Sequence, residues 1–121
     1  MAGLNFNITD QNLADILCIA FEGGINYWCS GSVKVKDNDF KGADYASDAL
    51  PKGAVLYIPD MDEGDMELTK EKLIAGVEKY VNEHDADIID LATKEIDCCH
   101  VDAEVADMMV QLAVHGEVVY G

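Results

Sequence analysis

The sequence of 121 residues contains no arginine, because all eight of its basic residues are lysines, whereas 24 residues are aspartate or glutamate. Its formal net charge is −16 at pH 7. Arginine is the usual residue for bidentate contacts to phosphate and guanine. A chain without it and with this charge is expected to repel nucleic acids and anionic membranes and to attract basic proteins. Acidity also keeps proteins soluble without any partner, and that alternative stays open.

The sequence also lacks a long apolar run, and its N-terminus has no basic segment followed by apolar residues. We therefore expect neither a signal peptide nor a membrane span. The four cysteines are Cys18, Cys29, Cys98 and Cys99, and they show no disulfide-framework spacing. A reducing cytoplasm is the simplest context for them.

Half of the residues are hydrophobic and 26% are charged, which is ordinary globular composition. The length fits one domain, residues 1–121, with one modest core. Apolar periodicity and turn residues predict an α+β fold, with three or four helices packed on a small, mainly antiparallel sheet. The predicted elements are a helix over 10–22, an extended segment over 25–36, a short helix within 43–49, a hairpin over 54–69, helices beginning after Thr69 and Asp102, and a final strand over 117–120.

In the hairpin, Val55, Tyr57, Met66 and Leu68 are expected to supply the pairing faces. The helix after Thr69 has one apolar stripe, and the helix after Asp102 is expected to end at His115 and Gly116. Residues 84–99 fit either a short helix around 89–96 or a structured loop.

Two segments concentrate the acidic residues. One is residues 60–67, and the other is residues 83–107, where Lys94 is the single basic residue among nine acids. On a helix, acids three or four residues apart lie about 5–6 Å from each other. That spacing is comparable to the spacing of phosphates along a nucleic-acid strand. The candidate partner-binding residues are Asp60, Asp62, Glu63, Asp65, Glu67, Asp87, Asp90, Asp97, Asp102, Glu104 and Asp107. An ordinary solvated face is the alternative.

Motifs for chemistry are weak. The cluster from Asp60 resembles a calcium loop, but Gly64 lies at position five of that loop instead of six, and no helix precedes it. Cys98, Cys99 and His100 lack a second ligand pair for zinc. Phosphate-loop, dinucleotide and nucleophile-elbow patterns are absent from the sequence. We therefore expect no cofactor, no metal and no catalytic residues, although a cysteine–histidine pair that meets in space remains open.

Three aromatic residues have two interpretations. Tyr27, Trp28 and Tyr120 could line a binding surface, since Trp and Tyr often anchor protein contacts. The chain has few other large aromatic residues to fill its interior, so we expect these three to pack in the core.

The segments FEGGINYWCSGSVKV, YASDALPKGAVLYIPD, LTKEKLIAGVEKYV and VDAEVADMMVQLAVHGEVVYG resemble a family of small acidic proteins from phages and mobile elements of low-GC Gram-positive bacteria. The resemblance runs through nearly the whole chain and brings no set of catalytic residues. It implies a phage protein, and small acidic phage proteins of this size are often antagonists of host defence, including anti-CRISPR and antirestriction proteins.

The expected function is thus inhibition of a host defence effector in the cytoplasm. The chain would bind a basic nucleic-acid-binding surface through an acidic, nucleic-acid-mimicking face, as an anti-CRISPR-like protein. The expected partner is a basic protein of the defence machinery, and neither nucleic acid nor membrane is expected to bind directly. Two alternatives remain: a sponge that sequesters a host signalling nucleotide, and a phage accessory protein without an anti-defence role.

Overall fold

The first helix begins where the sequence predicts. The computed structural model describes residues 7–84, 89–90, 95–96 and 101–121. In it, α1 (Asp10–Ile19) is capped by Thr9, whose side chain accepts a hydrogen bond from the Asn12 amide. The Asn12 side chain accepts one in return from the Thr9 amide, which completes a capping box. The helix continues as a π-helical turn, η1 (Ala20–Gly24), so the predicted helix over residues 10–22 is confirmed.

The predicted hairpin is confirmed and supplies two strands, β2 and β3, of a three-stranded antiparallel sheet in the order β1-β2-β3. Its strands are β1 (Lys34–Val35), β2 (Leu56–Asp60) and β3 (Gly64–Leu68). The predicted faces of β2 are wrong, because Leu56 and Ile58 are fully buried whereas Val55 and Tyr57 are half-buried. Odd-numbered and even-numbered positions of this strand both carry apolar residues, so the alternation cannot show which set faces the core. Packing against the helices decides it.

Two predicted extended segments differ in the structure. The predicted segment 25–36 is extended only in its later part: residues 25–28 form a turn, Cys29 makes a single bridge to Asp60, and the chain pairs as a strand at Lys34–Val35. Residues 117–120 form no strand, because the amides of Val119 and Tyr120 both donate to the Gln111 side-chain oxygen, each at 2.8 Å. A side chain therefore satisfies the backbone donors that a neighbouring strand would have satisfied.

The remaining predicted helices are confirmed. The short α2 (Ala46–Ala49) leads into a 3-10 turn, Leu50–Lys52. Thr69 caps α3 (Lys70–Glu83), and Asp102 caps α4 (Ala103–His115). Gly116 ends α4 in the left-handed conformation, with φ 80°.

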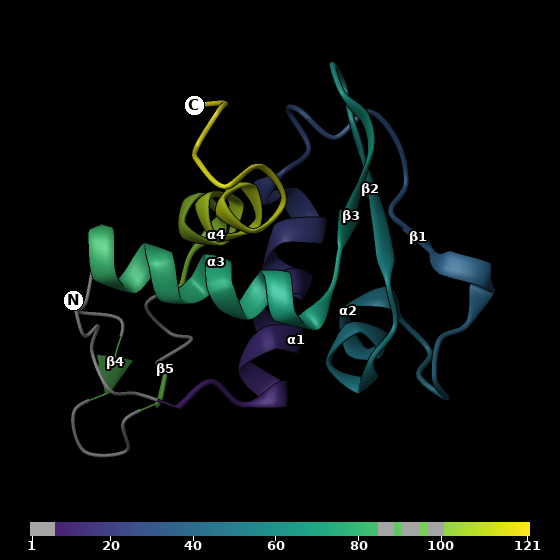
Figure 1. The fold of residues 1–121 in the computed structure, drawn as a ribbon, viewed down its shortest axis with the longest axis horizontal. Helices are drawn as coiled ribbons and strands as arrows, with labels where there is room; N and C mark the ends of the chain where they lie inside the picture. Colours follow the sequence, from purple (N-terminus) through teal and green to yellow (C-terminus); the bar gives the residue numbers. More distant parts are fainter. Residues whose placement is uncertain (1–6, 85–88, 91–94, 97–100) are drawn as a thin grey trace.

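Helices α3 and α4 lie side by side and pack closely (Figure 1). Gly76 permits this contact, because a Cβ at that position would lie 2.6 Å from the Met109 carbonyl oxygen. In the segment 84–99, the described residues include two short paired strands, β4 (Ile89–Asp90) and β5 (Glu95–Ile96). The helical alternative for residues 89–96 is therefore wrong at these four positions.

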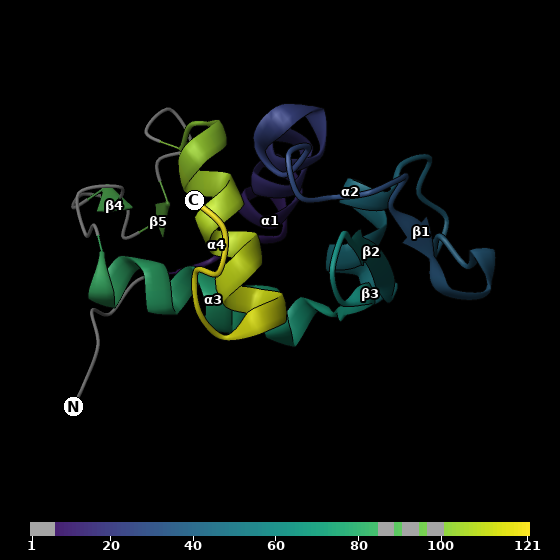
Figure 2. The ribbon, with the colours of Figure 1, turned by 90° about the horizontal axis from the view of Figure 1, so that it is seen from above.

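The molecule is an α+β fold in which α1, α3 and α4 lie on one side and the hairpin, α2 and β1 on the other (Figures 1 and 2). One core joins the two sides, and Leu13, Leu17, Leu56, Leu73 and Met109 within it are fully buried. Among the described residues, no helix is both long and apolar enough to cross a membrane. The hairpin turn, the loop after η1 and the C-terminal tail meet at one end of the molecule (Figure 1).

Candidate functional site

Two of the predicted surface acids are buried and hydrogen-bonded inside the protein. Asp60 is 3% exposed and Asp107 is 5% exposed. A buried carboxylate is tolerated only when hydrogen bonds replace its hydration, and both have such partners. A partner therefore cannot contact the Asp60 or Asp107 carboxylate directly.

Asp107 joins α4 to the loop that follows η1. Its Oδ1 accepts hydrogen bonds from Trp28 Nε1 at 2.7 Å and from Gln111 Nε2 at 2.9 Å. Its Oδ2 accepts a hydrogen bond from the Tyr27 hydroxyl. Partial burial of its hydroxyl and the hydrogen bond to Asp107 raise the pKa of Tyr27 to about 12. Asp107 thus binds the side chains of Tyr27 and Trp28 from the loop to α4, and it keeps the Tyr27 phenol neutral.

Gln111 lies one helical turn after Asp107 and holds the C-terminal tail. Its oxygen accepts the two tail amides described above, and its Nε2 also lies 3.1 Å from the Tyr120 carbonyl oxygen. Gln111 is fully buried. One amide side chain thus satisfies donors and an acceptor of the tail and closes the tail over α4.

Asp60 performs the corresponding role at the hairpin turn. Its Oδ1 accepts hydrogen bonds from the Tyr120 hydroxyl at 2.7 Å and from the amides of Asp62 and Glu63. Its Oδ2 lies 2.9 Å from His115 Nε2, which must carry the proton because an ionised carboxylate only accepts. Burial alone would raise the pKa of Asp60, but these four hydrogen bonds together hold that pKa below its usual value.

An aromatic cluster connects the two aspartates. Trp28 and Tyr120 are stacked with ring centroids 5.6 Å apart and an interplanar angle of 15°. His115 packs edge-on to each ring at 5.9 Å. The hydrogen bond to Asp60 raises the pKa of Tyr120, so its hydroxyl stays a donor. The expectation that Trp28 packs in the core is confirmed, whereas Tyr27 is 53% exposed and that expectation was wrong for it.

The segments that this network joins expose apolar side chains. Met61 at the hairpin turn is 52% exposed, and Val119 in the tail is 51% exposed. Together with Tyr27, they are three of the four large exposed hydrophobic side chains of the described part of the chain. A hydrogen bond from the Met61 amide to the Trp28 carbonyl oxygen, at 3.0 Å, connects the turn to the aromatic loop.

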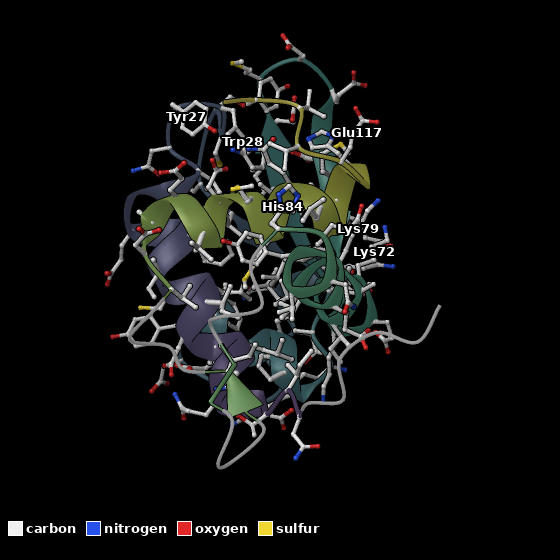
Figure 3. All side chains as sticks on the ribbon, turned by 90° about the vertical axis from the view of Figure 1, so that its left-hand side faces the viewer. Tyr27, Trp28, Lys72, Lys79, His84 and Glu117 are labelled. Atoms are coloured by element: carbon white, nitrogen blue, oxygen red, sulfur yellow. The ribbon has the colours of Figure 1, made fainter. Side chains whose placement is uncertain are left out.

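Exposed carboxylates lie on the hairpin turn, on α4 and in the tail, beside these apolar residues in the chain or in contact with the same network. Asp62 accepts a hydrogen bond from the Tyr120 hydroxyl at 3.2 Å, and the Glu104 carboxylate contributes to raising the Tyr27 pKa. We define the acidic end as three exposed apolar and five exposed acidic residues: Tyr27, Met61, Val119, Asp62, Glu63, Asp65, Glu104 and Glu117. Figure 3 shows Tyr27, Trp28 and Glu117 at this end, with Lys72 and Lys79 on the α3 side. Among the described residues, no lysine forms an ion pair with the five acids.

The other candidate residues lie elsewhere. Glu67 is exposed on β3 and lies 3.5 Å from the Lys72 ammonium group. Asp102 is exposed, but its carboxylate caps α4 by accepting from the Val105 amide at 2.9 Å. Asp90 belongs to β4. Asp87 and Asp97 lie outside the described residues, as do Cys98, Cys99 and His100.

Within the part of the chain that the structure describes, no three His, Cys, Asp or Glu side chains are grouped so as to hold a metal ion. Sequence reasoning missed Met61, Val119 and Glu117 as surface residues of one site, because nothing local shows that the tail returns to the hairpin. Comparisons of the chain with protein-family models, with characterised proteins and with solved structures find no match.

Proposed function

We propose that this chain acts by binding, and that its acidic end occupies the basic nucleic-acid-binding surface of a partner protein. The observation that carries the proposal is the composition of that end. Three exposed apolar side chains lie on segments tied together by hydrogen bonds to Asp60 and Asp107, and the exposed carboxylates beside them form no ion pair with a lysine of the described residues. Protein interfaces combine an apolar centre with a polar rim, and aromatic side chains are frequent anchors.

The charge of the site defines the partner. Acids without lysine partners attract a surface rich in lysine and arginine, and long-range attraction speeds the encounter. Nucleic-acid-binding proteins carry such surfaces, so a bound acidic end would exclude the nucleic acid. We propose an effector of host defence as the partner and anti-CRISPR-like inhibition in the host cytoplasm as the role. The resemblance to small acidic phage proteins supports this narrower assignment.

The hydrogen-bond network beneath the acidic end holds its aromatic side chains in place, which favours binding at that surface. Tyr27, Trp28 and Tyr120 are each held by a hydrogen bond to a carboxylate. A rigid aromatic surface loses little side-chain entropy on association, which increases affinity for a given contact area. The groove between α1 and α2 is lined, among the described residues, by three acids and no lysine, so its charge disfavours an anionic nucleotide.

The proposal is tested with purified guide-loaded RNA-guided nucleases and restriction nucleases, each assayed for cleavage of target DNA with and without the chain. The test variant is the triple charge reversal Asp62→Lys, Glu63→Lys and Asp65→Lys at the hairpin turn. The matched control reverses three exposed acids elsewhere, Asp44→Lys, Glu78→Lys and Glu83→Lys, and so gives the same net charge. Circular dichroism establishes that both variants fold.

The expected result is inhibition of one nuclease by the parent chain, loss of inhibition in the hairpin variant and retention in the control. Inhibition should also weaken as ionic strength rises, since exposed ion pairs are screened. Equal inhibition by both variants, or affinity independent of salt, would refute the role of the acidic end. Failure of the parent chain against every nuclease of the panel, together with no protection of phage on defence-bearing hosts, would refute the anti-defence role.

A further inference from the structure

A groove lies between α1, η1, the loop of residues 25–33 and α2. Its volume is about 780 Å³, which falls within the range of roughly 300–1,000 Å³ typical of small-molecule sites. None of its lining residues belongs to the acidic end, although Asn26 and Cys29 line it from the loop that carries Tyr27. The groove is thus a concave feature separate from the acidic end, with its own chemistry.

The floor of the groove is apolar. Ala14 and Ile25 are buried there, and Phe21 and Val33 are half-buried beside them. Tyr45, at the start of α2, is 69% exposed and also lines the groove. An aliphatic chain could lie along this floor, and the Tyr45 ring offers an electron-rich face to a nearby cation.

Among the described residues that line the groove, every charged one is acidic. Asp15, Glu22 and Asp48 line it, and none of the described lining residues is lysine or histidine. Asp15 and Glu22 are seven residues apart on α1 and its π-helical continuation, which places them on one face and roughly 10 Å apart along the axis. Asp48 faces them from α2.

Cys18 lies between Asp15 and Glu22 on this face, and its thiol interacts with both carboxylates. Its Sγ lies 3.5 Å from a Glu22 carboxylate oxygen. Burial raises the pKa of the Cys18 thiol, and the carboxylates of Glu22, Asp15 and Asp48 raise it further. All three acids therefore lie within electrostatic reach of one point in the groove.

We propose that this groove binds a linear aliphatic polyamine. Its ammonium groups would lie at the carboxylates of Asp15, Glu22 and Asp48, and its methylene segments would lie on the apolar floor. An anion would be repelled by three carboxylates, and a neutral apolar ligand would gain nothing from their charge. A single lysine side chain could satisfy one carboxylate, whereas acids separated along the groove match a chain of several ammonium groups. This proposal is independent of the proposed function of the acidic end.

The test measures spermidine binding to the full chain by titration calorimetry at low and moderate salt. The groove variant is Asp15→Asn, Glu22→Gln and Asp48→Asn. The control, Asp44→Asn, Glu78→Gln and Glu83→Gln, removes the same charge at exposed positions outside the groove. We expect the groove variant to bind spermidine at least about tenfold more weakly, the control to match the parent, and Tyr45→Ala to weaken binding measurably. Spermidine should also raise the melting temperature of the parent by mass action.

Three results would overturn the proposal. Equal weakening in the groove and control variants would show non-specific attraction to a chain of charge −16. Tighter binding of a tri-lysine peptide than of spermidine at equal charge would assign the groove to a protein segment. No saturable binding at low salt would exclude a polyamine site. Because no nuclease takes part in these measurements, their outcome is independent of the cleavage assays.

Discussion

Replacing Asp107 with leucine, which has a similar branched shape, is expected to destabilise the fold by about 3 kcal/mol. The main term is the Trp28 indole, which is 1% exposed and donates to Asp107 Oδ1 at 2.7 Å. Leaving such a buried donor without an acceptor costs about 1–3 kcal/mol. Gln111 retains the Tyr120 carbonyl as an acceptor, and the exposed Tyr27 can turn to water, so their losses add about 1 kcal/mol.

The assay is chemical unfolding followed by the fluorescence of the single tryptophan, Trp28. The conservative variant Asp107→Asn keeps an acceptor for the indole and should lose about 1 kcal/mol. The control Glu104→Gln, an exposed acid on the same helix, should stay within about 0.5 kcal/mol of the parent. A double-mutant cycle with Trp28→Phe isolates the indole contact.

The direction of the Asp107 effect separates the two interpretations of this residue. If Asp107 were one more solvated acid of a chain with charge −16, removing its charge would reduce self-repulsion and stabilise the protein slightly. A leucine variant as stable as the parent would therefore refute the buried network. A melting temperature lower by on the order of 10 °C would agree with it.

Three further predictions concern single contacts. Gly24→Ala should destabilise the fold by about 1–3 kcal/mol, because the added Cβ would lie 2.6 Å from the Ala103 carbonyl oxygen. The control is Gly23→Ala, whose Cβ would meet no atom within 4 Å. Equal denaturation midpoints for the two variants would contradict the close approach of Gly24 to α4. The pKa of Asp60 is lowered in the folded protein, so this carboxylate stabilises the fold above the usual aspartate pKa, and the effect is lost as pH falls through the folded pKa. In Asp60→Asn, the free energy of unfolding should therefore fall less steeply at acid pH than in the parent, as measured by unfolding at successive pH values. The Tyr27 phenol should titrate spectrophotometrically near pH 12, and its stabilising effect should be lost as pH rises from about 10 to 12; a normal tyrosine titration in the folded protein would count against the contact with Asp107.

The parts of the fold that sequence reasoning predicted are those whose causes are local. Thr9, Thr69 and Asp102 cap helices through bonds to amides three residues away, so each cap is visible in the sequence. The hairpin is equally local, because its two strands are joined by a short turn.

The misplaced segments make side-chain hydrogen bonds that strand propensity does not reveal. The amides of Trp28 and Cys29 close the turn by donating to the Ile25 carbonyl oxygen, and the Trp28 indole donates to Asp107, 79 positions away in the sequence. The tail was expected to pair as a strand because its apolar residues have strong strand propensity, and the buried Gln111 overrides that propensity.

One signal for the buried site was present in the sequence. Asp107 and Gln111 are four residues apart, so they share a face of α4, and they alternate with the buried Ala106 and Val110. Polar residues inside an apolar stripe require partners, and the single tryptophan of the chain carries an N–H group that needs an acceptor. Composition alone could not separate Asp60 and Asp107 from the other acids of their clusters.

The structure changes the form that mimicry of nucleic acid could take. The predicted acids of residues 83–107 would imitate a phosphate strand only if they followed one another along an exposed helix. In α4, Glu104 is exposed and Asp107 is buried, so in the described part of that helix the row ends after the first turn. The carboxylates of the acidic end instead come from the hairpin turn, α4 and the tail, around exposed Tyr27, Met61 and Val119. Binding through this end would depend on apolar contact as well as charge, so a fraction of the affinity should remain at high salt, where purely ionic binding disappears.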